Sequence, residues 1–375
     1  MSTRALLRGA RLVDDRGVVP DGWLLIEDDR IRARGQGDPG HHDAAVYDLR
    51  GRTVTPGFVD LHCHGGGGHS GEDGVDGVLG LAAFHRAHGT TALVVSLATA
   101  PFETMLDRLG AVRDAARRDD RILGAHLEGP FLAAAHRGAH EASLLLEPSL
   151  ELADRILATA EGTLRQITLA PERTPDPVID RFLGAGVHVA VGHTSATFAE
   201  ARGAFARGAS ILTHTFNGMP GIHHRQPGPV VAAIEASATL EIIADGVHVD
   251  PAVVALLMSA APGRVALVTD AITAAGAPDG DYPLGGHVIQ VREGIARLGE
   301  HGSLAGSTLT LDRAVRVCVD AGVPLESAIR SATAVPARAI GERDRGLLDP
   351  GARADLVELD DQLEVLAVWS RGARS

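Results

Sequence analysis

The sequence predicts an α/β fold, a TIM (β/α)8 barrel with a small β-sandwich domain formed from both chain ends. Eight apolar, β-branched runs alternate with Ala-, Leu- and Arg-rich helical stretches, which is the pattern of repeated βα units. Near both chain ends, apolar and polar positions alternate between closely spaced turn signals, as in short antiparallel strands. An open doubly wound sheet is the alternative, but no G-x-G-x-x-G follows the first run.

The small β domain is expected to comprise residues 1–52 and 345–375, which leaves residues 53–344 for the barrel. Asp-Pro-Gly at residues 349–351 is a turn signal that precedes two strand-like runs, so the two chain ends are expected to pair in one sheet. Helices are expected at residues 75–88 and 150–161, among others. The expected barrel strands are residues 58–64, 91–97, 122–128, 166–171, 187–194, 211–217, 241–249 and 265–271.

The composition excludes several kinds of chemistry. All 35 basic residues are arginine, so a Schiff-base lysine, a P-loop lysine and a metal-bridging carboxylated lysine are excluded. The net charge of −13 argues against nucleic acid and anionic membrane as partners, because phosphate neutralisation needs clustered cations. Two cysteines make no disulfide framework, and the apolar runs are too short to span a bilayer. We expect a cytoplasmic protein.

Metal-competent side chains end five of the eight expected strands. Catalytic groups of such barrels lie at these strand ends, so we expect the side chains to converge. Each residue alone is more often a hydrogen-bonded core or surface residue, but together four histidines and two carboxylates match the ligands of zinc and similar divalent ions. Because side chains alternate along a strand, the two histidines of H-C-H share one side and Cys63 faces the other. The six residues are His62, His64, Glu128, His193, His214 and Asp270.

Several segments of the sequence resemble motifs of known protein families. P-G-F-V-D-L-H-C-H-G at residues 56–65 is similar to the opening motif of the amidohydrolase superfamily. Four further segments resemble the N-acetylglucosamine-6-phosphate deacetylase family, and of these H-L-E-G-P and D-G-x-H-x-D are the more specific. They are H-L-E-G-P-F at 126–131, G-H-T at 192–194, T-H-T-F-N-G-M-P at 213–220, and D-G-V-H-V-D at 245–250 followed by L-V-T-D-A at 267–271.

The resemblance implies a divalent metal site with one or two ions per subunit. Glu128, His193 and His214 would hold the principal ion, and His62 and His64 would hold a second with Glu128 shared and Asp270 close by. Zinc is the expected ion, with iron, manganese, cobalt and cadmium as alternatives. In this family a glutamate on the third strand does the bridging that a carboxylated lysine does in relatives, which fits a chain without lysine.

The resemblance also implies roles around the metal. Asp270 would move the proton of the attacking water, and His140 would donate to the developing oxyanion, although without the family His140 reads as a surface-loop histidine. Arg225 offers a planar fork suited to phosphate and would reach across a two-fold interface, which implies a homodimer; otherwise it reads as a solvated loop residue. The expected substrate contacts are Ala139, Asn217, Gly218, Arg225, Asp245, His248, Leu304, Ala305 and Gly306.

The expected function is metal-dependent hydrolysis of the N-acetyl amide of N-acetylglucosamine 6-phosphate, which gives acetate and glucosamine 6-phosphate in amino-sugar catabolism. One alternative is another amidohydrolase activity, either hydrolysis of a cyclic amide or deamination. Arg225 and His248 would then have no phosphate to bind. The other is a catalytically inactive barrel that serves as a binding protein. A missing Asp270 or Glu128 would indicate the inactive barrel, and both are present.

Overall fold

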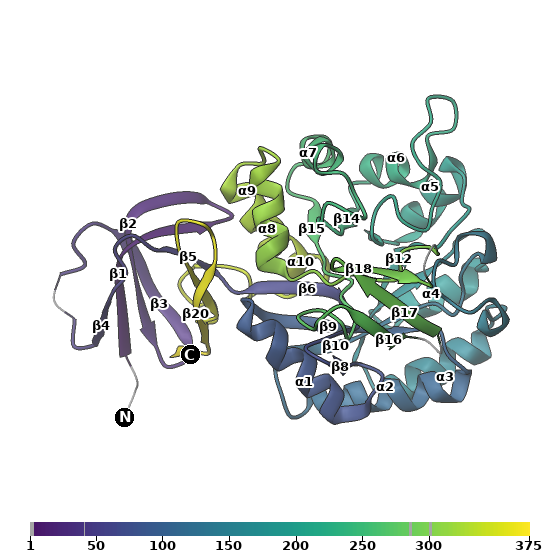
Figure 1. The fold of residues 1–375 in the computed structure, drawn as a ribbon, viewed down its shortest axis with the longest axis horizontal. Helices are drawn as coiled ribbons and strands as arrows, with labels where there is room; N and C mark the ends of the chain where they lie inside the picture. Colours follow the sequence, from purple (N-terminus) through teal and green to yellow (C-terminus); the bar gives the residue numbers. More distant parts are fainter. Residues whose placement is uncertain (1–3, 41, 285–286, 300–301) are drawn as a thin grey trace.

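The computed structural model describes residues 4–40, 42–284, 287–299 and 302–375. A parallel barrel surrounded by helices makes up most of the chain, and a smaller domain with its own eight-stranded sheet, which contains strands from both chain ends, lies beside it (Figure 1). This is the α/β barrel fold that the alternating pattern predicts. No helix in the described part of the chain is long and apolar enough to cross a membrane.

Eight parallel strands form the barrel in the order β15-β14-β13-β12-β11-β10-β9-β6. The first and last strands meet through a parallel bridge between Cys63 and Ala271 and a 2.8 Å hydrogen bond from the Asp270 N–H to the His62 carbonyl. The seam of the barrel therefore lies at the metal-competent residues. The strands are β6 (Phe58–Cys63), β9 (Thr90–Ala98), β10 (Ile122–Glu128), β11 (Leu164–Leu169), β12 (His188–Val191), β13 (Ile211–Leu212), β14 (Thr239–Ile242) and β15 (Val265–Leu267).

A helix follows each barrel strand, and local sequence signals set the helix ends. Ser149 accepts a hydrogen bond from the Leu152 N–H at the start of α3, and Thr197 and Glu200 form a capping box on α5. The expected helices 75–88 and 150–161 correspond to α1 and α3. The helices are α1 (Gly74–Ala87), α2 (Phe102–Ala116), α3 (Leu150–Ala160), α4 (Asp176–Gly184), α5 (Phe198–Arg207), α6 (Gly228–Glu235), α7 (Pro251–Ala260), α8 (Leu311–Asp320), α9 (Leu325–Ala332) and α10 (Ala334–Ala339), with short 3-10 turns at Ala134–His136 and Ala142–Leu144.

The later barrel strands are shorter than the apolar runs predict. β6, β9 and β10 match the expected bounds within one residue, whereas β12 to β15 all end before the expected residues 194, 217, 249 and 271. At three of these ends the backbone turns into the left-handed region, at His193, His214 and Asp270, which takes it out of the regular ladder. The missing strand residues are therefore those that carry the polar side chains of the barrel mouth.

Strands from both chain ends share the sheet of the smaller domain, as expected. β19 pairs antiparallel with β5, and β5 pairs parallel with β1. Its apolar face packs around the buried Trp369. The division of the domains at residues 52 and 345 stays a prediction. The strands are β1 (Arg4–Asp14), β2 (Gly17–Glu27), β3 (Arg30–Gln36), β4 (Ala45–Asp48), β5 (Thr53–Pro56), β19 (Leu356–Leu359), β20 (Val365–Ser370) and β21 (Ala373–Arg374).

A third sheet, which the sequence pattern does not predict, lies over the barrel (Figure 1). Ile289, Val291 and Ala296 of this sheet pack with Ile272 and Ala305 from the loops after β15, so the sheet adjoins the barrel mouth. A short hairpin follows β6 at the same end. The strands are β16 (Gly280–Leu284), β17 (His287–Arg292) and β18 (Ile295–Leu298) in the sheet, and β7 (Gly65–Gly66) and β8 (His69–Ser70) in the hairpin.

Candidate active site

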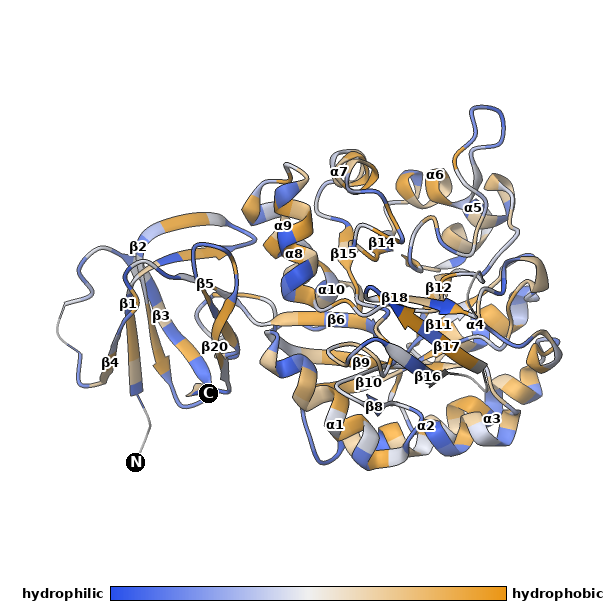
Figure 2. Ribbon diagram, viewed as in Figure 1, coloured by the Kyte–Doolittle hydropathy of each residue, from blue (hydrophilic) through white to orange (hydrophobic). Residues whose placement is uncertain are grey.

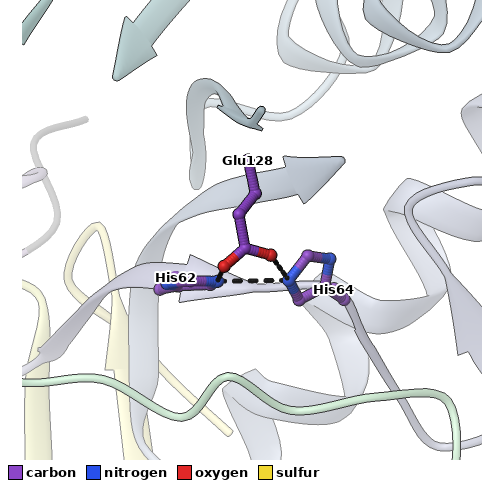
Figure 3. Close-up of side chains that lie close together, drawn as sticks. All are labelled: His62, His64 and Glu128. Atoms are coloured by element: carbon purple, nitrogen blue, oxygen red, sulfur yellow. Dashed lines mark hydrogen bonds and ion pairs between the residues drawn. The ribbon is translucent and has the colours of Figure 1, made fainter. Parts of the chain in front are cut away.

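The six metal-competent side chains meet at the mouth of the barrel. His62 lies on β6, His64 is the first residue after this strand, and Glu128 is the last residue of β10. The Glu128 carboxylate lies between the two imidazoles, with Oε1 3.5 Å from His62 Nε2 and Oε2 3.2 Å from His64 Nε2 (Figure 3). Cys63, between the two histidines, is buried in the hydrophobic core around the barrel, as side-chain alternation predicts.

Three of the six residues reach the cluster through a left-handed backbone. His193 has φ 44°, His214 has φ 25° and Asp270 has φ 48°. Non-glycine residues adopt this conformation only where the surroundings hold them, and such residues concentrate at functional sites. Each of the three follows a barrel strand by two or three residues, so the turn brings a side chain from the strand end into the mouth.

One carboxylate contacts all four histidines of the set. Glu128 Oε1 lies 3.0 Å from Nε2 of both His193 and His214, in addition to its contacts with His62 and His64. Asp270 Oδ1 lies 3.3 Å from Nε2 of both His62 and His64. Two neighbouring subsites therefore share Glu128.

The donor atoms fit a divalent ion. His193 Nε2 and His214 Nε2 are 3.0 Å apart, and His62 Nε2 and His64 Nε2 are 3.1 Å apart. Two imidazole nitrogens at this distance cannot both carry a hydrogen, whereas paired lone pairs beside a carboxylate form the nitrogen and oxygen set that zinc and related ions bind. His62, His64 and Glu128 present ligand atoms that all lie within 4.8 Å of one another.

Hydrogen bonds on the far ring nitrogens distinguish His193 from His140. His193 Nδ1 donates to the His136 carbonyl at 2.8 Å, so its Nε2 presents a lone pair to the cluster. His140 Nδ1 instead accepts the Thr99 N–H at 3.3 Å, so in the neutral ring the hydrogen is on Nε2, 3.4 Å from Glu128 Oε2. Burial also lowers the pKa of His140, which outweighs the opposing effect of Glu128. His193 is arranged as a metal ligand, and His140 as a hydrogen-bond donor.

Electrostatics keep both acids of the cluster ionised. Burial alone raises the pKa of Glu128, but the charge of His62 and the neighbouring imidazoles of His140 and His193 hold that pKa well below its usual range. Burial has the same effect on Asp270, and the imidazoles of His62 and His64 outweigh it, so its pKa is also lowered. Both side chains are therefore carboxylates at neutral pH, as a ligand and a proton acceptor must be.

A pocket of about 280 Å³ opens directly above the cluster. Most of the expected substrate contacts line it, and Asp245 lies behind the pocket wall, where its Oδ2 accepts a 2.7 Å hydrogen bond from His248 Nδ1. Arg225 does not line this pocket. It is exposed on the loop between β13 and α6. The expected residues that do line it are Ala139, His140, Asn217, Gly218, His248, Leu304, Ala305 and Gly306.

Two glycines allow close approach to the cluster. Gly218 has φ 59°, and a Cβ there would lie 2.9 Å from His193 Nδ1. Gly306 has φ 62°, and a Cβ would lie 2.4 Å from Ile272 Cγ2 and 3.0 Å from the Asp270 carbonyl oxygen. Any side chain at these positions would strain the backbone and displace a residue of the site.

Several residues of the pocket and its supports are not predicted from the sequence. Thr99, Ile272 and Ser303 line the pocket, and Thr99 orients His140 through its backbone N–H. His136 fixes His193 through its carbonyl. Backbone contacts of this kind leave no side-chain pattern in a sequence, so only the structure reveals them.

His85 supports the loop next to His64 and should make stability depend on pH. It is fully buried, its Nε2 donates to the Gly65 carbonyl at 2.9 Å, and burial lowers its pKa to about 4 from 6.5. The unfolded chain therefore binds a proton more readily, so the stabilising contribution is complete above pH 6.5 and is lost as the pH falls towards 4. The pKa difference corresponds to about 3 kcal/mol.

We therefore expect His85→Gln, which keeps a donor for Gly65 but cannot titrate, to lose less stability than the original chain between pH 7 and pH 4.5. Urea unfolding of the metal-free proteins at both pH values measures this difference. An unchanged difference between the two proteins across this range would show that His85 is not the titrating group.

Residues 53–374 match the amidohydrolase family. The chain belongs to the amidohydrolase family. Proteins of this family use a divalent metal ion, in agreement with the histidine and glutamate cluster.

Relatives of this amidohydrolase extend over nearly its whole length. It is 38% identical to N-acetylgalactosamine-6-phosphate deacetylase of Escherichia coli O157:H7 over 98% of each chain. It is 32% identical to N-acetylglucosamine-6-phosphate deacetylase of Vibrio furnissii, over 97% of this chain and 93% of the relative. A solved structure from Mycobacterium smegmatis matches it with a TM-score of 0.94 and 40% identity over 99% of each chain. That structure is an aspartate-to-alanine variant of N-acetyl-D-glucosamine-6-phosphate deacetylase in complex with its sugar phosphate.

These comparisons confirm the resemblance to the N-acetylglucosamine-6-phosphate deacetylases and the barrel fold. The roles of the individual site residues stay predictions, because the comparisons match whole chains rather than side chains.

Proposed function

We propose that this amidohydrolase is a metal-dependent deacetylase that hydrolyses the N-acetyl amide of N-acetylglucosamine 6-phosphate to acetate and glucosamine 6-phosphate. The observation that carries this proposal is the shared Glu128 carboxylate, which contacts four imidazoles at the floor of the pocket. Relatives that are named for this activity match the chain over nearly their whole length, which supports the choice of substrate.

Two subsites would hold metal. Glu128, His193 and His214 would bind the principal ion, and His62 and His64, with Glu128 shared, would bind a second. A bound divalent ion lowers the pKa of water towards about 7 and polarises the amide carbonyl. We propose zinc because this ligand set is typical of it, and metal analysis distinguishes zinc from iron, manganese, cobalt and cadmium.

Asp270 would transfer the proton. Its carboxylate lines the pocket beside His62 and His64 and is ionised at neutral pH, so it can accept the proton of an attacking water. It would then return this proton to the amine as the tetrahedral intermediate breaks down. Because the leaving amine needs a proton for departure, one carboxylate can serve both steps.

His140 would stabilise the oxyanion. The hydrogen is on its Nε2, at the pocket and 3.4 Å from Glu128 Oε2, because Nδ1 accepts the Thr99 N–H. A fixed donor in a buried site stabilises charge that develops on the carbonyl oxygen without having to reorient. Burial lowers the pKa of His140 and so keeps the ring neutral, and the neutral ring donates its Nε2 hydrogen without adding a positive charge beside the metal site.

The remaining pocket residues would hold the sugar phosphate. Leu304, Ala305 and Gly306 would contact the sugar along their backbone, while Asn217 and Gly218 would present amides to the phosphate. His248, oriented by Asp245, would add a side-chain donor.

Arg225 would complete the phosphate site of a second subunit. It lies on the exposed loop before α6, which projects from the barrel at the upper right in Figure 1 and is largely hydrophilic in Figure 2. Ile222 on this loop is 54% exposed, and a neighbouring subunit would cover it. We therefore propose a homodimer in which this loop reaches the neighbouring pocket.

Arg225→Ala should raise KM for N-acetylglucosamine 6-phosphate by about 10- to 100-fold, since a hydrogen-bonded charge contributes about 1.5–3 kcal/mol. KM for unphosphorylated N-acetylglucosamine should change little. Steady-state acetate release with both sugars measures the difference, and Arg202→Ala, at an exposed arginine of α5, serves as the control. Equal effects on both sugars would argue against phosphate contact.

A second candidate substrate is N-acetylgalactosamine 6-phosphate, favoured by the 38% identity to a deacetylase named for it. Acetate release from both epimers, with metal content measured on the same samples, tests the two candidates. No release from N-acetylglucosamine 6-phosphate by metal-loaded protein would overturn the proposed function. Turnover of a cyclic amide or a nucleobase would indicate the other amidohydrolase activities, and binding without turnover an inactive barrel.

A further inference from the structure

Glu241 is a fully buried acidic side chain that the proposed mechanism does not use. It lies on β14 with 0% of its surface exposed, between the apolar Leu240 and Ile242. Burying a carboxylate costs several kcal/mol unless partners compensate for the lost water. The groups that face Glu241 should therefore explain its presence.

Those groups lie across the barrel interior. Gln166 Nε2 on β11 donates to Glu241 Oε1 at 2.8 Å, and the other oxygen, Oε2, faces two candidate metal ligands. Oε2 lies 3.4 Å from the His214 backbone N and 3.5 Å from His62 Nδ1. Neither β11 nor β6 is next to β14 in the sheet, so the Glu241 side chain reaches these groups through the interior.

His62 needs an acceptor at this position. Its Nδ1 is buried and makes no hydrogen bond to a described residue, while its Nε2 faces Glu128 and Asp270. A histidine that binds a metal through Nε2 carries its hydrogen on Nδ1, and an acceptor behind Nδ1 fixes that tautomer and the ring orientation. Glu241 Oε2 is the carboxylate oxygen that faces this nitrogen.

We propose that Glu241 is a positioning residue for the second metal subsite: it holds the Nδ1–H of His62 and adds negative charge behind the His62 and His64 pair. The proposal rests on the metal-dependent function proposed above. It deepens that function because it makes metal binding at the second subsite depend on a residue that is not itself a ligand. The charge of Glu241 adds to those of Glu128 and Asp270 in a buried region, where electrostatic interactions are strong.

Glu241→Gln keeps the size of the side chain and removes its charge. We expect the affinity for the second equivalent of Zn²⁺ to fall by about 10- to 100-fold, the usual effect of losing such a partner, and the first equivalent to bind as before. Competition with a chromophoric chelator measures both affinities, and the absorption spectrum of the Co²⁺-loaded protein reports the geometry of each site. Unchanged affinity for the second equivalent would overturn the proposal.

A double-mutant cycle tests whether Glu241 acts through His62. In a His62→Ala background, Glu241→Gln should weaken metal binding much less than in the original chain, because the Nδ1–H partner is already absent and only the added charge is lost. Additive losses would show a general effect on the barrel and would also overturn the proposal. Glu358→Gln is the matched control: Glu358 is equally buried but lies in the sheet of the smaller domain, where Trp369 and Arg374 donate to it, and this variant should leave both equivalents unchanged.

Two further results keep this proposal separate from the proposed function. If Glu241→Gln does not fold, Gln166→Ala replaces it, since it frees the Glu241 side chain and should weaken the same second equivalent; normal binding would then overturn the proposal. A single ion in the unmodified protein would overturn it as well, because no second subsite would be filled. The deacetylase proposal would still stand or fall by acetate release.

Discussion

Asp270→Asn should lower kcat for N-acetylglucosamine 6-phosphate by on the order of 10²-fold or more, the contribution of a general acid and base. The amide cannot accept the water proton, and no other described carboxylate than Glu128 lines the pocket. Asparagine adopts the left-handed backbone at φ 48° at least as readily as aspartate, so the fold around the position should persist. Steady-state kinetics together with metal content measure the effect, and KM and metal content should stay close to the original values.

Asp312→Asn is the control for this substitution. Asp312 is also buried, but it lies on α8 outside the pocket, next to His88 and Arg316. We expect this variant to affect stability rather than kcat. If Asp270→Asn turned over substrate at the original rate, Asp270 would have no role in proton transfer.

Glu128→Gln should remove metal binding and activity together. Its Oε1 faces His193 and His214 and its Oε2 faces His64, so an amide places an N–H donor against a nitrogen lone pair and removes the shared charge. We expect acetate release to fall by more than the roughly 10- to 100-fold loss that outer partners of a metal site cause. Metal analysis after dialysis should show a parallel loss.

The same substitution should destabilise the metal-free protein. The buried imidazoles would lose their central anion, and an uncompensated buried charge costs about 3–5 kcal/mol. Urea unfolding of the metal-free proteins measures this cost, with Glu358→Gln as the buried control. Retention of metal and activity by Glu128→Gln would exclude the shared-carboxylate site.

The fold follows from the sequence because the barrel depends on repeated, local patterns. Apolar β-branched runs identify β6, β9 and β10 within one residue, and the flanking turn signals identify the sheet of the smaller domain. The strand ends that carry His193, His214 and Asp270 could not be predicted in this way. Their apolar neighbours continue the strand pattern in the sequence, but the strands end earlier, at left-handed turns that depend on the surrounding site. The sheet formed by β16, β17 and β18 was missed because three short strands within a long inter-helix segment give little periodicity.

The metal-competent set could be predicted because its residue types are unusual at strand ends, and the structure brings all six together. The supports of the set could not be predicted. Thr99 and His136 act through backbone atoms, and Glu241 reaches His62 across the barrel from a strand that is not its neighbour. A lone acid in an apolar strand is a signal that in retrospect could have identified Glu241.

The seam of the barrel has a consequence for how the protein is made. Asp60 and Thr269, which are joined by a 2.6 Å hydrogen bond across the seam, are separated by 209 positions in the chain. Asp270, which lies 3.3 Å from both His62 and His64, comes from the other side of that seam, so a nascent chain cannot complete the cluster until the last barrel strand has left the ribosome. An ion bound beside Asp270 would favour the closed barrel over any form with the first and last strands apart, because only the closed form brings this carboxylate to the other ligands. We therefore expect metal supply during synthesis to affect the yield of folded protein, as well as its activity.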